Sequence, residues 1–275
     1  MKKSILIISF LFPMSAVFGQ ADTSFQLIRI LHGDYKELTV DNLDNIYVLN
    51  SHNQVKKYNS NGDSVAVYND VRKFGQASLI DVSNPLKVLI YYRDFATVVM
   101  LDRFLNAVNV VDLRKQKILE AHAIGQSYDN SIWVYDELES KLKKIDEKGK
   151  LVQETADFRL MLGQAISPAK IFDENRYVYL YDSLKGVYVF DYFGALKNGI
   201  LIQHWQNLKV AGNYIFGSQH DTLYRYDIRS FRVDEWMMPG EILHADAFSF
   251  SSSRLYALKK DCEGKESCIF VYSIK

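Results

Sequence analysis

The feature that most constrains the fold is a repeat of short strand-like segments along the chain. Six segments rich in Tyr, Val, Ile and Leu begin at residues 46, 86, 132, 178, 214 and 255, so neighbouring copies start 36 to 46 positions apart. Each is followed, after a short turn or loop, by a partner segment that begins with an aliphatic residue and has a large apolar residue three positions later. The partners lie at 55–58, 98–101, 142–145, 187–190, 223–226 and 269–272.

Composition and turn chemistry favour strands over helices in these copies. β-branched and aromatic residues are enriched in them, and Asn61-Gly62 and the segment 147–150 with Gly149 are typical of hairpin turns. A period of about 40 residues with about four strands per copy is typical of β-propeller blades. A solenoid of the same period is the alternative, but helical repeats do not fit this composition and a β-helix uses shorter coils.

The two ends of the chain predict how a ring of blades would close. The last copy supplies only three strands, at 243–248, 254–259 and 268–274, whereas residues 25–30 form a strand ahead of the first full copy. Pairing that strand with the last one completes a sixth blade and removes an exposed edge. The sequence therefore predicts an all-β, six-bladed β-propeller with four-stranded antiparallel blades. It would be a single domain over 20–275 whose N-terminal strand completes the last blade.

Residues 1–19 have the three-part pattern of a secretory signal peptide. Lys2 and Lys3 precede an apolar run over 5–18, and Val17 and Gly19 suit the −3 and −1 positions of a cleavage site. The run is short for a membrane-spanning helix, and no later segment approaches the length that one requires. We therefore expect an exported protein, periplasmic or associated with the outer membrane, without a transmembrane segment. A buried N-terminal strand or helix is the alternative.

The only two cysteines, Cys262 and Cys268, lie close together near the C-terminus. An even number, a close spacing and an exported chain predict a disulfide between them. A zinc site would need two further ligands, and no His lies at a suitable spacing. Because the loop is small, we expect its stabilising effect to be modest.

The charge balance argues against nucleic acid as a partner. The chain has 33 basic and 33 acidic residues, and loss of Lys2 and Lys3 with residues 1–19 would leave 31 against 33, a net charge of −2. Nucleic-acid binding depends on basic side chains that displace counterions from phosphates. This sequence has no such basic excess.

Two copies have a more specific pattern. The first reads Asp-Asn-Leu-Asp-Asn-Ile-Tyr-Val-Leu over 41–49, and the third reads Asp-Asn-Ser-Ile-Trp-Val-Tyr over 129–135, with Leu-Lys-Lys-Ile-Asp over 142–146. This pattern resembles the NHL/YVTN-like six-bladed propellers of secreted bacterial proteins, although Asp44 and Asn130 or Ser131 stand where that family usually has Gly. The resemblance implies a propeller over the full length. Such propellers include binding modules, lyases and lactonases, so the fold leaves the function open.

One set of equivalent positions is a candidate metal site. Three aspartates in equivalent places could supply oxygen ligands to calcium, as in a calcium-dependent hydrolase or lyase. Asp also caps the backbone of turns, and a lysine in the ring opposes a cation, so we expect turn residues and no metal. The positions, five residues before each second strand, are Asp41, Asp81, Ser127, Asp173, Lys209 and Phe250.

Histidine and tryptophan give no sign of catalysis. No His pair has metal-binding spacing, and no acid-His-Ser or Cys-His order is present. His122 and His244 fall near the first strands of copies three and six, where either a polar channel wall or a ligand contact is expected. Trp133, Trp205 and Trp236 occupy non-equivalent positions, unlike the repeated docking motif that a quinone cofactor would need. The sequence predicts no catalytic residue and no cofactor.

Binding residues are expected where loops between second and third strands meet the connections between blades. Tyr, Arg, Met and Phe are enriched at protein interfaces. The predicted contact residues are Tyr91, Tyr92, Arg93, Phe95, Arg159, Met161 and His220, whereas Leu160 and Leu162 are expected to pack in the core. The leading hypothesis is a protein-binding or scaffolding module with a partner in the cell envelope. A calcium-dependent hydrolase, lactonase or lyase and a small-ligand sensor are the alternatives.

Overall fold

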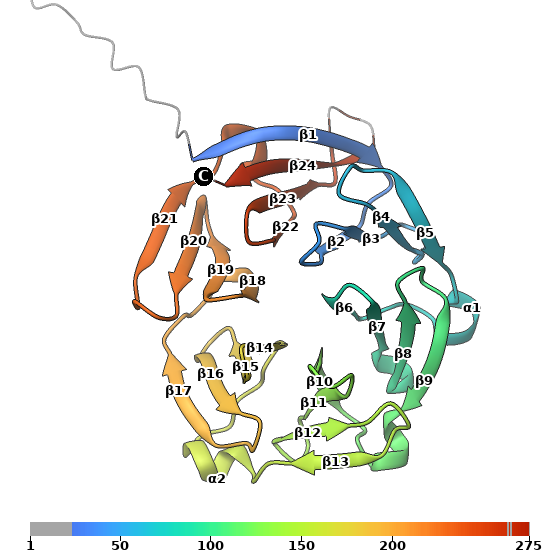
Figure 1. Cartoon of the computed structure of the whole chain (residues 1–275), viewed down its shortest axis with the longest axis vertical. Coiled ribbons are helices and arrows are strands. Elements are labelled where there is room, and N and C mark those ends of the chain that lie inside the picture. The colour runs from blue at the N-terminus through green and yellow to red at the C-terminus, as the bar shows by residue number, and fades with distance from the viewer. Residues whose placement is uncertain (1–23, 263, 265, 275) are drawn as a thin grey trace, which may run out of the picture.

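The strands form six four-stranded sheets around a common axis (Figure 1). The computed structural model describes residues 24–262, 264 and 266–274. The predicted signal peptide, residues 1–19, lies outside the described residues and stays a prediction. Every neighbouring pair of strands within a sheet is antiparallel, for example β2 with β3 (Glu37–Val40 with Ile46–Leu49). The predicted six-bladed propeller with four-stranded blades is confirmed.

Each blade places its first strand at the centre and its fourth at the rim. Blade 1 contains β2 (Glu37–Val40), β3 (Ile46–Leu49), β4 (Val55–Tyr58) and β5 (Ser64–Tyr68). Blade 2 contains β6 (Leu79–Asn84), β7 (Lys87–Tyr92), β8 (Thr97–Asp102) and β9 (Ala107–Asp112). Blade 3 contains β10 (Ala121–Gln126), β11 (Ile132–Asp136), β12 (Lys141–Ile145) and β13 (Leu151–Glu154).

The second half of the chain repeats this order. Blade 4 contains β14 (Lys170–Glu174), β15 (Tyr177–Asp182), β16 (Gly186–Asp191) and β17 (Leu196–Ile200). Blade 5 contains β18 (Gln206–Ala211), β19 (Tyr214–Gln219), β20 (Thr222–Asp227) and β21 (Val233–Met237). Blade 6 contains β22 (Ala247–Phe250), β23 (Arg254–Lys259), β24 (Ser267–Ile274) and, at its rim, β1 (Phe25–Gly33).

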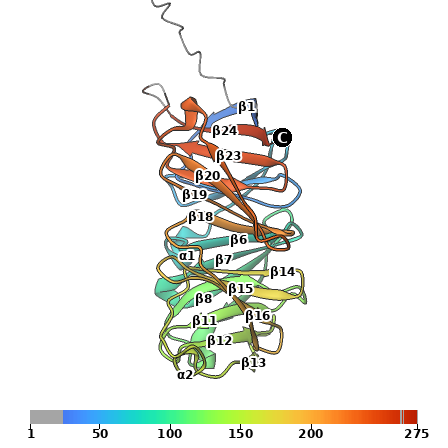
Figure 2. The ribbon, with the colours of Figure 1, turned by 90° about the vertical axis from the view of Figure 1, so that its left-hand side faces the viewer.

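Short helices occur only in connections within the described part of the chain. They are α1 (Val71–Phe74), η1 (Arg93–Phe95), η2 (Leu113–Gln116), α2 (Phe158–Leu162) and η3 (Gly240–Ile242). Seen from the side, the ring is a flat disc with α1 and α2 on the same side (Figure 2). The predicted strand at 243–248 is wrong in its bounds, because η3 and a positive φ of 66° at His244 precede β22.

The ring closes between the two ends of the described chain. β1 pairs antiparallel with β24 over its whole length, from Phe25 opposite Ile274 to Gly33 opposite Ser267 (Figure 1). Phe25 packs edge-on against the Tyr272 ring, with centroids 6.5 Å apart. The prediction that the N-terminal strand completes the last blade is confirmed, and β24 has no free edge.

The hydrophobic core is divided among the six seams between adjacent blades. Alternate residues of a strand face opposite sides of its sheet. In β3, Tyr47 and Leu49 pack toward blade 2, and Ile46 and Val48 pack toward blade 6. Because both sides of an inner strand are covered by other blades, both sides must be apolar. This explains the short continuous apolar runs that the repeat contains.

Aspartate or asparagine shapes the turns between third and fourth strands. Asp102 Oδ1 accepts hydrogen bonds from the backbone N–H of Phe104 and of Asn106, at 2.8 and 2.9 Å. A side chain that satisfies the N–H groups two and four positions later stabilises a tight turn. The same bonds recur at Asn59, Asp146 and Asp191, and Asp227 caps its turn in a similar way. The repeated aspartate in the sequence is therefore a turn residue.

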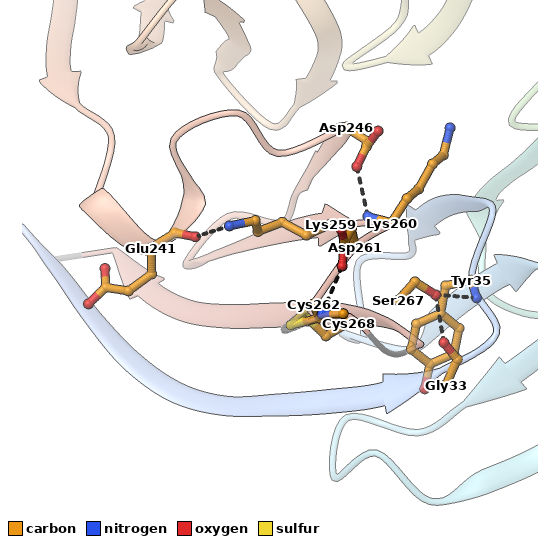
Figure 3. Close-up of a disulfide and its surroundings, with 11 residues drawn as sticks. Gly33, Tyr35, Glu241, Asp246, Lys259, Lys260, Asp261, Cys262, Ser267 and Cys268 are labelled. Atoms are coloured by element: carbon orange, nitrogen blue, oxygen red, sulfur yellow. Dashed lines mark hydrogen bonds between the residues drawn. A yellow bond between two sulfur atoms is a disulfide. The ribbon is translucent and has the colours of Figure 1, made fainter.

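The predicted disulfide is confirmed beside the closing seam. Cys262 and Cys268 are bonded, with Cα atoms 5.9 Å apart, between β23 and β24 (Figure 3). The neighbouring Ser267 Oγ donates to Gly33 O and accepts from the Tyr35 N–H, both at 2.6 Å. One hydroxyl thus joins the start of β24 to the segment that leads from β1 into blade 1.

Candidate functional site

One face of the disc collects most of the long connections. Since successive strands of a blade are antiparallel, the links between second and third strands and the links between blades emerge at the same end. We call this end the loop face. It bears all five short helices and the disulfide loop. The sequence-predicted contact residues lie on it or at the strand ends that lead to it.

Tyr91 and Tyr92 are not available to a partner. They end β7, and their side chains are 1% and 3% exposed. Tyr91 faces blade 3 and donates its hydroxyl to Ala121 O at 3.2 Å. Tyr92 faces blade 1, where its ring lies 5.1 Å from that of Phe74. The expectation that these tyrosines form a contact surface is wrong, because the adjacent blades cover both sides of the strand.

The next residues of the same connection are accessible. Arg93 and Phe95 belong to η1, and Phe95 has 42% of its surface exposed. Arg93 is exposed as well and donates through Nη2 to His122 O at 3.3 Å. A cation and an aromatic ring therefore stand together at the loop face of blade 2.

The helix α2 divides its side chains between core and solvent. Phe158 is fully buried and stacks on Phe190 with centroids 4.8 Å apart, and Met161 and Leu162 pack against the same cluster. Positions i, i+3 and i+4 share one side of a helix, so Leu160 points the other way and is 86% exposed. The prediction that Leu160 packs in the core is wrong, whereas that for Leu162 is confirmed.

The other two predicted residues differ in setting. Arg159 is exposed, and its guanidinium pairs with Asp157, the capping residue of α2, at 2.5 Å. This pair lowers the pKa of the Asp157 carboxyl. His220 is exposed in the tight turn between β19 and β20, where its φ is 51°. It belongs to blade 5, whereas α2 joins blades 3 and 4.

Exposed leucines on the loop face were missed by sequence reasoning. Leu138 and Leu184 sit in turns between second and third strands, and Leu119, Leu160 and Leu201 sit in connections between blades. All five are more than half exposed, Leu201 at 79%. We call Leu119, Leu138, Leu160, Leu184 and Leu201 the leucine row, since they follow one another from blade 3 to the start of blade 5. In the sequence, the indication of this row is a single Leu within each of the polar turns at 137–140 and 182–185.

A central channel is the second candidate site. The first strand of every blade lies nearest the axis (Figure 1), and side chains from these strands line a cavity of about 540 Å³. Its apolar lining includes Ile80, Phe172 and Phe248, and two lysines, Lys170 and Lys209, add positive charge. A cavity of this size is in the usual range for small-molecule sites.

The aspartates near the channel are held by donors from the protein. Asp41 accepts from the backbone N–H groups of Leu43 and Asn45, as predicted for a turn residue. Asp81 lies within β6, and besides capping Ser83 N–H it accepts from Gln126 N–H of blade 3 at 2.6 Å. Asp81 therefore caps a turn, as expected, and in addition links blade 2 to blade 3.

Asp173 also lies within a strand, β14, and joins two blades. Its Oδ2 accepts from Ser127 Oγ and Trp133 Nε1 of blade 3, both at 2.9 Å. Its Oδ1 accepts from the Tyr192 hydroxyl at 2.6 Å, and burial together with this bond raises the pKa of that tyrosine. Among the residues described, no three His, Cys, Asp or Glu side chains are grouped to hold a metal ion.

The remaining candidates lie away from the channel. Phe250 is buried in the seam between blades 5 and 6. His122 is the second residue of β10, with Nδ1 4.0 Å from Glu137 Oε2, and His244 precedes β22. Neither histidine lines the channel cavity. No helix in the described ranges is long and apolar enough to cross a bilayer.

Comparison with known proteins identifies the fold and goes no further. No protein-family model and no curated protein matches the sequence. Catalytically inactive virginiamycin B lyase from Staphylococcus aureus with quinupristin is similar in structure, with a TM-score of 0.60 and 11% identity over 91% of this chain and 100% of that chain. The β-propeller domain of Cps50 (Swd1) from Myceliophteria thermophila has a TM-score of 0.60 and 10% identity over the same shares.

A third similar structure is the Pan2 WD40 domain from Neurospora crassa. It has a TM-score of 0.58 and 9% identity over 91% of this chain and 95% of that one. At such identities a shared propeller carries no information on activity, since one propeller fold serves many functions. The narrower NHL/YVTN-like resemblance receives no support from sequence comparison.

Proposed function

We propose that this chain is an exported binding module that holds a protein partner of the cell envelope on its loop face. The supporting observation is the leucine row, which leaves five large aliphatic side chains in water on consecutive connections. A larger exposed apolar surface often marks a site of protein interaction, whereas single exposed apolar residues do not. Arg93, Phe95 and Arg159 on the same face are of the residue types that anchor protein interfaces.

The arrangement is suited to recognition by a rigid surface. The turns at Leu138 and Leu184 are short and sit on buried strands, β11 and β15, and α2 is anchored through buried Phe158. Side chains presented by a rigid scaffold lose little conformational freedom when a partner binds. Each leucine that becomes fully buried contributes about 1.5–3 kcal/mol of transfer free energy.

The test compares two faces of the same disc. The tagged protein is crosslinked in its native host, the partner is identified and purified, and its Kd is measured for two triple variants. Leu138→Ser/Leu160→Ser/Leu184→Ser removes part of the leucine row, and we expect at least about 100-fold weaker binding. The control, Leu43→Ser/Phe104→Ser/Phe193→Ser, changes three exposed apolar residues of the opposite face and should bind as the wild type does.

Three results would contradict the proposal. They are equal loss of affinity in both variants, unchanged affinity in the leucine variant, and the absence of any partner that binds saturably in purified form. N-terminal sequencing of the protein from the host tests export separately. A chain that begins at Gln20 supports it, and one that retains residues 1–19 contradicts it.

A further inference from the structure

The two lysines of the central channel are held in an unusual way. Lys170 opens β14 of blade 4, and its Nζ donates to Leu208 O of blade 5 at 3.1 Å. Lys209 lies in β18 of blade 5, and its Nζ reaches past blade 6 to donate to Val40 O of blade 1 at 2.5 Å. Both side chains line the channel cavity. One ammonium group of the channel thus lies against blade 5 and the other against blade 1. The positive charge of Lys170 adds to desolvation in lowering the pKa of Lys209.

Neither ammonium group forms an ion pair within the described part of the chain. An ammonium group has three N–H donors, and one hydrogen bond is present for each lysine here. Desolvation lowers the pKa of Lys170 to about 8. Desolvation does the same for Lys209, partly opposed by Asp41 and Asp81. The channel therefore holds two cations whose loss of water is only partly compensated.

Of the carboxylates that line the cavity, Asp41 and Asp81 do not fill this role, because protein donors already occupy them. Burial raises the pKa of the third, Glu174, and Lys209 acts in the opposite direction. Asp41 accepts four hydrogen bonds, two from backbone N–H groups and one each from Asn45 Nδ2 and the Tyr47 hydroxyl. Asp81 accepts two backbone N–H groups at 2.8 and 2.6 Å. The negative charges of Asp41 and Asp81 are thus stabilised by hydrogen bonds from turns and strands of the protein. Each lysine, with one hydrogen bond, has N–H groups left to donate to a ligand in the cavity.

The rest of the lining is apolar on several blades. Ile80 of blade 2 and Phe172 of blade 4 are partly exposed and line the same cavity as the lysines. Phe248 of blade 6 is mostly buried in the seam with blade 5 and borders this cavity. A pocket that is apolar with a few convergent polar groups is typical of small-molecule sites. Two lysines in an otherwise largely apolar lining favour a ligand that has one negatively charged group and an uncharged, apolar remainder.

We propose that the channel binds a small organic anion, with its carboxylate or phosphate between Lys170 and Lys209 and its apolar body against Phe172 and Phe248. This site is separate from the leucine row, and it does not depend on a protein partner. An anion between the two amines supplies the acceptors that each of them lacks. It also relieves the repulsion between the two cations, since opposite charge is attracted more strongly in a poorly solvated channel.

The test uses four probes that share a phenyl body and differ in charge. These are phenylacetate, phenyl phosphate, neutral phenylacetamide and cationic phenethylamine, titrated by calorimetry into the mature protein. We expect the two anions to bind, with a Kd between micromolar and millimolar, and the neutral and cationic probes to bind at least about tenfold more weakly. The order of the two anions identifies whether a carboxylate or a phosphate fits better.

Variants assign the binding to the lysines. Lys170→Met and Lys209→Met each keep an unbranched apolar side chain and remove the charge, and each should weaken anion binding at least about tenfold. Lys148→Met, on an exposed turn of blade 3, is the matched control and should leave affinity unchanged. Circular dichroism confirms that each variant is folded before titration.

Several outcomes would overturn the proposal. They are the absence of anion binding up to about 10 mM, equal binding of all four probes, preference for the cation or for calcium, and undiminished anion binding by the double lysine variant. Binding that is lost only in the leucine-row variant would place the anion on the loop face and would also contradict the channel site. Failure of the protein-partner experiment has no bearing on these titrations.

Discussion

Asp173 shows how one side chain can connect two blades. Its two carboxylate oxygens accept hydrogen bonds from Ser127 and Trp133 of blade 3 and from Tyr192 of its own blade. From the sequence, this aspartate is equivalent to Asp41, which caps a turn. The two residues share a position in the repeat but not a set of partners, because two of these three donors to Asp173 come from a neighbouring sheet.

The channel lysines make stability depend on pH in a defined direction. Their pKa in the folded chain, about 8, lies below the ordinary 10.5. Between these two pH values the unfolded chain binds more protons than the folded chain, so the free energy of unfolding rises with pH. Below about pH 8 both lysines are charged in the folded chain, and the full cost of their desolvation is present. We expect Lys170→Met/Lys209→Met to be more stable than the wild type near pH 7, and the difference to shrink toward about pH 9.5.

Urea unfolding of both proteins over this pH range measures the difference. Asp41, Asp44 and Asp81 act on Lys209, and all three are retained in both proteins. Tyrosine ionisation is common to both proteins and cancels. A difference that is constant with pH, as expected for Lys148→Met on the surface, would show that the channel amines are not desolvated.

The hairpin turns are the element in which sequence and structure correspond most directly. Asp102, Asp191 and Asp227 are the last residues of third strands, Asp146 directly follows one, and each caps the turn to the fourth strand. In blade 1 Asn59 makes the same two backbone hydrogen bonds. The role therefore needs a side-chain oxygen in that place, and a negative charge is not required.

We expect Asp102→Ala to lower Tm by about 2–4 °C, because two backbone N–H groups and Asn106 Nδ2 lose their acceptor. Asp102→Asn keeps Oδ1 as an acceptor for both backbone groups and should melt within about 1 °C of the wild type. Differential scanning calorimetry of the three proteins is the measurement. A larger loss for Asn than for Ala would mean that charge, and not turn capping, explains the repeated aspartate.

At the scale of the whole molecule, the ring depends on one pair of strands that are distant in sequence. β1 covers the outer edge of β24, and Ser267 links the start of β24 to Gly33 and Tyr35. The disulfide between Cys262 and Cys268 lies within blade 6 and spans only six positions. The disulfide links two nearby positions of one blade, whereas the pairing of β1 with β24 closes the ring.

A chain that begins at residue 34 should therefore lose its closing strand. We expect a lower Tm and the formation of dimers or larger species, because the exposed backbone of β24 can pair with another chain. A chain that begins at residue 24 keeps all of β1 and is the control. Light scattering after gel filtration and thermal unfolding follow both. If the shorter chain is monomeric and equally stable, β1 does not close the ring in the way described.

The sequence alone was sufficient for the number of blades, for their second and third strands, for the joining of the two ends and for the cysteine pair. Each of these rests on a local pattern, such as the runs at 46–49 and 132–135, and repetition makes the pattern unmistakable. The start of β22 escaped prediction because η3 and His244 form a connection of irregular backbone.

The exposure of particular side chains was decided only by the tertiary structure. Tyr92 looks like a contact residue and is buried, whereas Leu160 looks like a core residue and is exposed. Lys170 showed no signal in the sequence, yet it lines the same cavity as Lys209. The physical reason is common to all of these: in a propeller every seam is made by two sheets, so the surroundings of a side chain depend on a neighbouring blade about 40 residues away.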